Sequence, residues 1–244
     1  MNANSKIALV TGATRGIGLQ TVRQLAEAGV HTLLAGRSRE RAVEAALALQ
    51  AEGLPVEAIA LDVVDEAGIA AAAEQVTARH GRLDILVNNA GILLDDVAVP
   101  VSEQTLATWR ATFETNLFGL IAVTQAFLPL LRLAPAGRIV NVSSMLGSLA
   151  LHLDPASPIY DMKLPAHDVS KTAVNAWTVH LAHELRETPI RVNTVHPGYV
   201  KTDMNAGEGE LDIADGARTS VALALAGDDA PNGSFRYFDE VLPW

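Results

Sequence analysis

The sequence contains no cysteine, which excludes a disulfide framework, a thiolate metal site and a cysteine nucleophile. Basic residues are also scarce: 18 Lys and Arg stand against 28 Asp and Glu, a formal net charge of −10. Such a charge repels polyphosphate, so we expect no nucleic-acid partner.

Long hydrophobic runs are missing too. The longest uncharged stretch, 115–131, falls short of the ~20 apolar residues that a membrane span needs, and polar Asn116 and Gln125 interrupt it. We therefore expect a buried helix of a soluble protein and no membrane partner. The opening residues MNANSKIALV lack a basic segment followed by a long apolar one, so we expect no signal peptide and a cytoplasmic location.

What the sequence does contain is enough apolar material for a sizeable core. Of its 244 residues 49% are hydrophobic and 19% charged, which favours one domain over 1–244. Short β-branched runs alternate with stretches of helical periodicity, which predicts an α/β fold with a doubly wound parallel sheet in three layers, a Rossmann fold. The predicted strands are 6–12, 31–36, 56–61, 84–91, 138–144, 190–198 and 234–238. The predicted helices are 17–28, 39–52, 66–80, 103–132, 167–187 and 213–226.

Two segments interrupt this alternation. Residues 145–166 contain three prolines and no clean period, and residues 199–212 are polar and contain glycine. Both follow predicted strands at their C-terminal ends, where open α/β sheets bind ligands. We expect both to be substrate-side loops, with 145–166 as a lid insertion.

A glycine-containing loop, TGATRGIG at 11–18, follows the first predicted strand and opens into a helix. Gly12, Gly16 and Gly18 permit a tight turn and close backbone approach, and the helix N-terminus offers free N–H groups to a pyrophosphate. The spacing is G-x-x-x-G-x-G, which is not the commoner G-x-G-x-x-G. An ordinary tight turn between strand and helix is the alternative interpretation.

The end of the second predicted strand indicates which dinucleotide would bind. An acidic residue there would bind a ribose 2′-hydroxyl, whereas arginine favours a 2′-phosphate. Arg37 and Arg39 follow this strand with no carboxylate before Glu40, and Arg15 in the glycine loop adds a further cation. We predict NADP(H) as the cofactor, with solvated arginines at a helix start as the alternative.

The same order of motifs continues along the chain. Asp62-Val63 follows the third predicted strand, and NNAG at 88–91, Asn116, NVSS at 141–144, SKTAVNA at 170–176 and HPGYVKT at 196–202 come after it. With these motifs the chain resembles the short-chain dehydrogenase/reductase family from about residue 6 to residue 205. The long segment between Ser143 and Lys171, together with the ending at 241–244, resembles the carbonyl-reductase-like branch of that family.

The resemblance implies a role for each matching residue. The implied cofactor contacts are Gly12, Thr14, Arg15, Gly16, Ile17 and Gly18 around the pyrophosphate and adenosine ribose, Arg37 at the 2′-phosphate, Asp62 and Val63 at the adenine, Asn88, Ala90 and Gly91 along the cleft, Lys171 at the nicotinamide ribose, and Pro197, Gly198, Val200 and Thr202 beside the nicotinamide. In such proteins Ser143 would bind the substrate oxygen and Asn116 would hold a water of a proton relay. A tyrosine four residues before the lysine would donate the proton.

At that tyrosine position the sequence departs from the family. His167 stands four residues before Lys171, and Ser170, Ala173 and Asn175 match the family pattern around it. On a helix such residues share a face, so His167 and Lys171 are predicted to point the same way. We therefore assign His167 to the catalytic set with Asn116, Ser143 and Lys171.

Histidine is a poor replacement for a phenol in this role. Imidazole is shorter by roughly 2 Å, and a neighbouring ammonium favours its neutral form, which is a weak acid. Loss of a general acid typically lowers the rate by ~10²–10⁴. We expect a carbonyl reductase with impaired or redirected activity; a reductase of imines, which can arrive protonated, and a non-catalytic NADP(H)-binding protein are the alternatives.

The remaining predictions concern the substrate, metals and assembly. Met145, Tyr160 and Met204 are candidate substrate contacts. The apolar side chains that the two segments offer to a pocket indicate a small apolar carbonyl or imine substrate: Leu146, Leu149, Leu151, Ile159, Tyr160 and Met204. Tyr160 is not expected to replace the catalytic tyrosine. The spacing His180-x-x-His183-Glu184 matches no zinc motif, so we predict no metal site. Residues 145–166 can cover a helical surface that relatives use between subunits, which favours a monomer. His196, at a strand end, is expected to hydrogen-bond locally.

Overall fold

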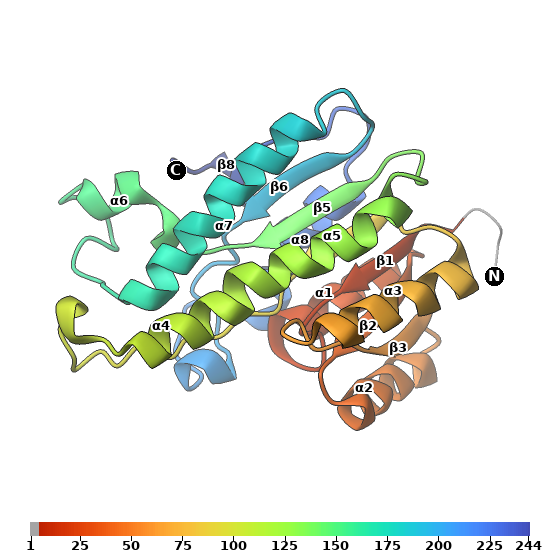
Figure 1. The fold of residues 1–244 in the computed structure, drawn as a ribbon, viewed down its shortest axis with the longest axis horizontal. Coiled ribbons are helices and arrows are strands. Elements are labelled where there is room, and N and C mark those ends of the chain that lie inside the picture. The colour runs from red at the N-terminus through yellow and green to blue at the C-terminus, as the bar shows by residue number, and fades with distance from the viewer. Residues whose placement is uncertain (1–4) are drawn as a thin grey trace.

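A computed structural model describes residues 5–244, so the first four residues of the predicted domain lie outside the described range. Its centre is one sheet with the strand order β3-β2-β1-β4-β5-β6-β7-β8 (Figure 1). The strands are β1 (Ile7–Val10), β2 (His31–Gly36), β3 (Val56–Ala60), β4 (Ile85–Asn88), β5 (Arg138–Val142), β6 (Arg191–Val195), β7 (Phe235–Tyr237) and β8 (Glu240–Val241). All pairings from β3 to β7 are parallel, and β8 pairs antiparallel with β7. The predicted doubly wound sheet is confirmed.

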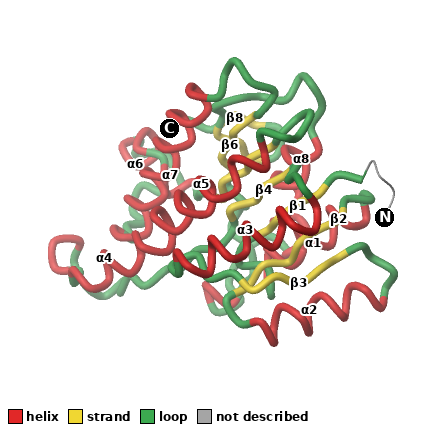
Figure 2. The backbone as a smooth tube through the Cα atoms, turned by 45° about the vertical axis from the view of Figure 1, so that its right-hand side comes forward, coloured by secondary structure: helices red, strands yellow, loops and turns green. Residues whose placement is uncertain are grey.

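Helices cover both faces of this sheet (Figure 2). They are α1 (Gly16–Glu27), α2 (Arg39–Ala51), α3 (Glu66–His80), α4 (Leu106–Phe113), α5 (Leu120–Leu131), α6 (Leu149–Leu153), α7 (Pro165–Glu184) and α8 (Ile213–Leu225). One hydrophobic core joins α3, α5 and α7 to the sheet, and a second joins α1, α2 and α8 to the opposite face. Successive residues of β1 alternate between them: Ile7 and Leu9 belong to the first core, Ala8 and Val10 to the second. β1 is therefore apolar on both sides, as a parallel strand buried between helices is expected to be.

The predicted helix 103–132 is a continuous helical rod over Leu106–Leu131. Between α4 and α5 its winding loosens into a π-helical segment, Glu114–Gly119. By length and composition this rod is apolar enough to cross a membrane, but Val123, Phe127 and Leu131 are fully buried in the core. A core helix of a soluble fold accounts for it, in agreement with the sequence prediction.

The segment 145–166 is more ordered than its sequence indicates. Met145–Gly147 forms a 3-10 turn, and Ser148 accepts a hydrogen bond from Leu151 N to begin α6. A helix of five residues is too short for periodicity to reveal it. The two-residue strand β8 is likewise absent from the prediction.

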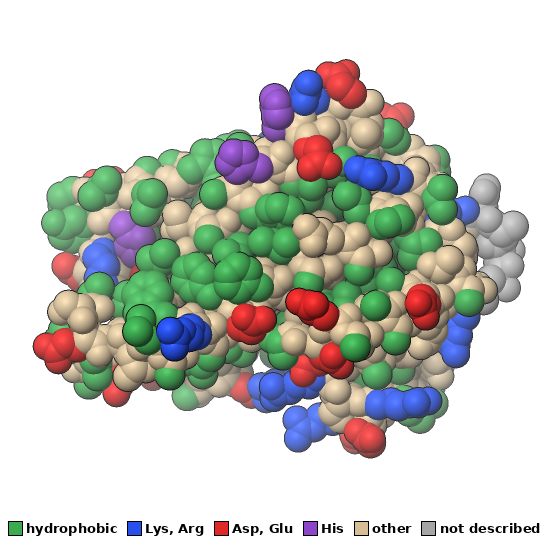
Figure 3. All heavy atoms as spheres, in the orientation of Figure 1, with side chains coloured by type: hydrophobic (Ala, Val, Ile, Leu, Met, Phe, Trp, Pro, Cys, Tyr) green, Lys and Arg blue, Asp and Glu red, His purple; other side chains and the backbone are tan. Residues whose placement is uncertain are grey.

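Apolar side chains gather on the outer face formed by the rod and α7 (Figure 3). Leu106, Phe118, Val169 and Val179 are each more than 40% exposed. The predicted monomer stays a prediction.

Candidate active site

The glycine loop lies at the carboxyl end of β1 and turns sharply into α1. Gly12 and Gly16 have positive φ angles of 62° and 57°, which L-residues other than glycine rarely adopt. A Cβ on Gly12 would lie 2.8 Å from Ala90 Cα, and one on Gly18 would lie 2.4 Å from Asn89 Nδ2. Arg15, the residue before α1, provides no side-chain cap, so the first N–H groups of the helix remain open to an anion.

Asn89 fixes this loop against the end of β4. Its backbone N–H donates to Thr11 Oγ1 over 3.0 Å, and its side-chain amide donates to the carbonyl oxygens of Thr11 and Gly12 over 2.8 and 3.2 Å. Asn89 belongs to the NNAG motif but is not among the predicted site residues. The predicted cleft residue Asn88 is buried, and its amide donates to Thr124 and Asn141 inside the core.

The predicted 2′-phosphate site lies where β2 ends. Arg37 is exposed there, and Ser38 caps α2 by accepting from Arg41 N. Ser38 also donates to Glu40 Oε2 over 2.8 Å, so the nearest carboxylate already has a partner. Thr14 packs against Gly36, whose added Cβ would lie 2.4 Å from Thr14 Cγ2. The end of β2 therefore offers a cation and no free acid, the arrangement that suits a phosphate.

Further predicted cofactor contacts border the same edge of the sheet. Asp62 is half-buried after β3 and accepts from Val64 N, and Val63 is buried against Gly119. Arg15 pairs with Asp203 over 2.8 Å, and both side chains are more than 70% exposed. This ion pair links the glycine loop to the short turn Asp203–Asn205 within the predicted loop 199–212.

Three of the predicted catalytic side chains lie at the carboxyl ends of the central strands. A Cβ on Gly91 would lie 3.4 Å from Asn116 Oδ1 and 3.5 Å from Lys171 Nζ, so the segment that follows β4, the π-helical segment and α7 converge. Ser143, directly after β5, is buried and donates to the Lys171 carbonyl oxygen over 3.3 Å. The geometry thus brings Gly91, Asn116, Ser143 and Lys171 together from four segments.

The Lys171 ammonium is deeply buried and has hydrogen-bonding capacity to spare. Nζ donates to the Val142 carbonyl oxygen over 2.8 Å, its one partner among residues 5–244. An ammonium carries three donors, so two stay available for a ligand. Burial lowers the pKa of Lys171 to about 8 because the charged form loses solvation.

Asn116 is held in place by backbone and side-chain partners. Its Oδ1 accepts from Ile92 N over 2.8 Å, and its Nδ2 donates to Ile92 O and to Ser170 Oγ over 3.0 Å each. Ser170 in turn donates to the His167 carbonyl oxygen over 2.7 Å. The looser winding at Glu114–Gly119 is a feature that often marks functional sites in helices.

His167 lies in the first turn of α7 and is buried. The Asp95 carboxylate caps this turn by accepting from Ala166 N over 2.7 Å and from His167 N over 3.0 Å. His167 Nδ1 lies 3.4 Å from Asp168 Oδ1, which leaves Nε2 as the ring nitrogen free to face a ligand. Asp95 is not among the predicted site residues, because no local sequence pattern connects it with a helix that begins about 70 residues later; it contacts Ala166, 71 residues away.

Asp168 also joins α7 to the 145–166 segment. Its Oδ2 accepts from Leu164 N over 2.9 Å and lies 3.5 Å from His152 Nε2. His152 Nδ1 in turn lies 3.0 Å from Lys163 Nζ. This chain of polar contacts anchors the predicted lid beside the histidine.

His196 corrects one expectation about the end of β6. Its Nδ1 accepts from Met145 N over 3.1 Å, so its hydrogen bond is long-range and not local. Burial lowers the pKa of His196 to about 4, and its ring packs 4.9 Å from that of Tyr237. A neutral His196 therefore holds the start of the lid segment. The predicted nicotinamide neighbours follow it: Pro197, Gly198 and Thr202 are half-buried and Val200 is buried.

The predicted substrate contacts lie on the two loops. Met145, two residues after Ser143, is half-buried, whereas Tyr160 and Met204 are 39% and 52% exposed. The Tyr160 carbonyl oxygen accepts from Lys163 Nζ, and the same ammonium lies 5.5 Å from the Tyr160 ring. Among these candidates only Met145 adjoins the buried polar groups in sequence.

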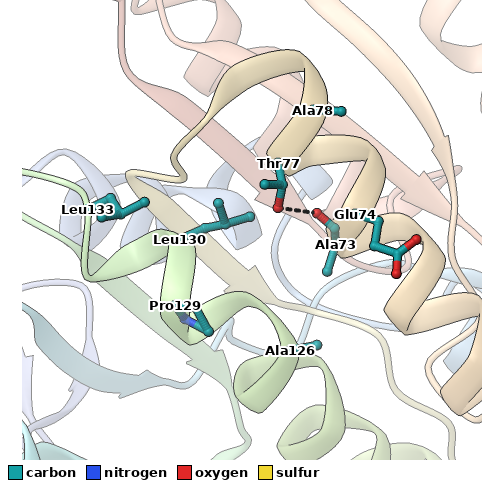
Figure 4. A pocket seen from close by; sticks show the side chains of 8 residues that line it. All are labelled: Ala73, Glu74, Thr77, Ala78, Ala126, Pro129, Leu130 and Leu133. Atoms are coloured by element: carbon teal, nitrogen blue, oxygen red, sulfur yellow. Dashed lines mark hydrogen bonds between the residues drawn. The ribbon is translucent and has the colours of Figure 1, made fainter.

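A separate hollow of about 480 Å³ lies between α3 and α5 (Figure 4). Its lining is mostly apolar and includes Ala73, Ala126 and Leu130. It contains none of the predicted site residues, so we do not assign the active site to it.

The sequence of the chain is similar to those of several known proteins. A family model described as short chain dehydrogenase matches residues 6–211. The chain is 34% identical to (-)-isopiperitenone reductase of Mentha piperita over 97% of this chain and 98% of that protein. It is 33% identical to (+)-neomenthol dehydrogenase of Capsicum annuum, with coverage of 98% and 97%.

Solved structures show the same fold. NADPH-bound carbonyl reductase from chicken fatty liver matches with a TM-score of 0.84 and 28% identity, covering 98% of this chain and 99% of that one. Salutaridine reductase from Papaver somniferum matches with a TM-score of 0.82 and 30% identity, covering 94% and 99%.

Proposed function

Because the chain belongs to the short-chain dehydrogenase family, we propose that it is an NADPH-dependent reductase of small apolar carbonyl compounds, with His167 in the place of the proton-donating tyrosine. The observation that carries the proposal is the convergence of Asn116, Ser143 and Lys171 beside the glycine loop. The carbonyl reductase with NADPH bound, and the relatives named for the ketone isopiperitenone and the alcohol neomenthol, support it.

The residues present fit the phosphorylated dinucleotide. Gly12 leaves open a position that a side chain would fill, the α1 N-terminus is uncapped by its neighbour, and Arg37 stands at the end of β2 without a free acid beside it. The two unused donors of Lys171 suit the hydroxyl groups of a ribose. When bound, NADPH supplies a hydride to the carbonyl carbon.

The protein's own residues would position and polarise the substrate. The Ser143 hydroxyl, now turned to the Lys171 carbonyl, would donate instead to the substrate oxygen, where negative charge develops. Lys171 would hold the ribose, and its ammonium would stabilise that charge. Asn116, fixed by Ile92 and Ser170, would hold a water at the end of the relay.

His167 would act as the proton donor, directly or through a water. With its Nδ1–H directed at Asp168, the ring can give a proton from Nε2 to the substrate oxygen only when both nitrogens are protonated, and Nε2 would then regain its proton from water. Because the imidazole is shorter than a phenol, proton delivery to a ketone oxygen would be inefficient. We therefore propose impaired or redirected carbonyl reduction.

Two other functions remain as proposals with the same cofactor site. An imine that arrives protonated would need no proton donor at position 167. A reductase of such imines would still use Ser143 and Lys171. A protein that binds NADP(H) without turnover would use only the glycine loop and the arginines.

The test is the rate of NADPH oxidation with panels of ketones, aldehydes and imines, for the wild type beside Ser143→Ala. Reductase activity that Ser143→Ala lowers by at least ~10² supports the proposal, since removing a hydrogen-bond donor to a developing oxyanion costs about that much. Tight NADPH binding without oxidation by any panel member would favour the binding protein.

A further inference from the structure

Three potential metal ligands meet at the end of the sheet opposite the glycine loop. His31 begins β2, Glu57 lies near the start of β3, and His80 is the last residue of α3. Leu33 and Ile59, which share a strand face with His31 and Glu57 respectively, belong to the core beneath α3. Both side chains therefore point toward the helix that ends in His80.

The ligand atoms of the three residues are close together. Glu57 Oε2 lies 3.5 Å from His31 Nε2 and 3.3 Å from His80 Nε2, and all three atoms lie within 4.8 Å of one another. The two imidazole rings are 5.3 Å apart and inclined at 44°. Arg79 binds the other carboxylate oxygen, Glu57 Oε1, which leaves Oε2 directed at the imidazoles.

Both imidazole nitrogens are buried beside Glu57 Oε2 without making a hydrogen bond of good geometry to it. His31 Nε2 and His80 Nε2 are inaccessible to solvent and have no hydrogen-bond partner within the described part of the chain. The His80 side chain is only 3% exposed, and that of His31 is 14% exposed. Buried polar atoms are almost always paired, so two such orphans aimed at one oxygen indicate a missing ligand.

We propose that His31, Glu57 and His80 bind a divalent transition metal ion of the zinc type. With Zn–N and Zn–O bonds of about 2.0–2.2 Å, neighbouring ligands of a tetrahedral ion lie roughly 3.3–3.5 Å apart, which matches both distances to Glu57 Oε2. Two imidazoles and one carboxylate are a set that zinc uses with water in the fourth position.

The surroundings suit that ion. Glu57 is 24% exposed, so one side of the cluster is open to water. Arg79 would orient the ligating carboxylate in the way that outer hydrogen-bond partners of metal sites do.

The ion would join three elements that hold the far end of the cofactor-binding half of the sheet. It would link β2, β3 and α3 on the side away from the carboxyl ends of the strands, so it would hold these elements together and take no part in the proposed reaction. No hydride or proton of the proposed reaction passes near it.

The test uses the full chain after removal of metal with a chelator. Zn²⁺ is titrated by calorimetry into the wild type, His31→Gln, His80→Gln and a double control, His180→Gln with His183→Gln. The control histidines are exposed on α7 and collect metal only as surface groups. We expect one Zn²⁺ per chain in the wild type and the control, and binding at least ~100-fold weaker in each cluster variant, because loss of a ligand should exceed the 10–100-fold effect of an outer partner.

A second measurement needs no variant and covers the case that a cluster variant fails to fold. Co²⁺ added to the wild type should give the visible absorption of a tetrahedral site and hyperfine-shifted N–H signals from two imidazoles. Absence of stoichiometric Zn²⁺ binding, or loss of binding in the α7 control with retention in the cluster variants, would overturn the proposal. So would a Co²⁺ spectrum without imidazole signals.

Discussion

Gly12 offers a sharp test of how the loop after β1 is built. Its φ angle of 62° is costly for any residue with a Cβ, by about 1–2 kcal/mol. The added methyl group of Gly12→Ala would also lie 2.8 Å from Ala90 Cα, a backbone atom that cannot rotate away. Overpacking of this kind typically adds ~1–3 kcal/mol.

Gly29 is the matched control, since it separates backbone strain from crowding. Its φ angle is 83°, and an added Cβ would meet nothing within 4 Å. Gly29→Ala should therefore lower the free energy of unfolding by only about 1–2 kcal/mol. Gly12→Ala should lower it by about 2–5 kcal/mol, the sum of the two effects.

The assay is equilibrium unfolding in urea, followed by NADPH binding measured through cofactor fluorescence. Gly12→Ala should lose both stability and NADPH affinity. The loop must move away from Ala90, and its backbone would then no longer lie where the proposed contact with the cofactor needs it. Gly29→Ala should keep the wild-type affinity. Equal destabilisation by the two substitutions, or unchanged NADPH affinity in Gly12→Ala, would refute the reasoning.

Three further predictions follow from other parts of the site. Arg37→Ala should weaken NADPH binding by roughly 10–100-fold, the value of a charge-assisted hydrogen bond, and leave NADH binding unchanged. Arg41→Ala is the control. An equal loss of NADPH and NADH binding in Arg37→Ala would contradict the 2′-phosphate assignment. Because burial lowers the pKa of Lys171 to about 8, the folded state holds fewer protons there than the unfolded state from about pH 8 to the ordinary value of 10.5. The wild type's free energy of unfolding should therefore rise across that range relative to that of Lys171→Met. Urea unfolding at each pH measures both values, and a difference between the two proteins that does not change with pH would refute the prediction. Asp95→Ala should lower the free energy of unfolding by about 0.5–2 kcal/mol through loss of a helix cap. The control Asp96→Ala removes an acceptor for a local N–H only and should change it less. Hydrogen exchange at the start of α7 would show whether that turn is the part that loosens.

Much of the fold could be predicted because its signals are local. The residues 31–36 form β2 as predicted, and 66–80 form α3, since β-branched runs and helical periodicity are properties of short windows. The order of the segment 145–166 could not be predicted, because α6 has too few residues to show a helical period. Long-range contacts such as that of Met145 with His196 stabilise the segment.

The site residues fall into the same two groups, those in local motifs and those brought together only by folding. The glycine loop and Lys171 lie in motifs that a sequence displays, whereas Asp95 acts on α7 through a contact 71 residues away. The cluster of His31, Glu57 and His80 likewise has no common motif, since two strands and a helix bring its members together. Only the packed structure reveals such long-range contacts.

The central claim is that His167 occupies the place of the proton donor in an NADPH-dependent carbonyl reductase. It is tested most directly by NADPH oxidation with ketones, aldehydes and imines, for the wild type beside His167→Tyr. The account predicts that the tyrosine variant reduces ketones faster by about 10²–10⁴, the usual contribution of a general acid, with NADPH affinity unchanged. Ketone reduction that stays at the wild-type rate in a folded, NADPH-binding His167→Tyr protein would contradict it.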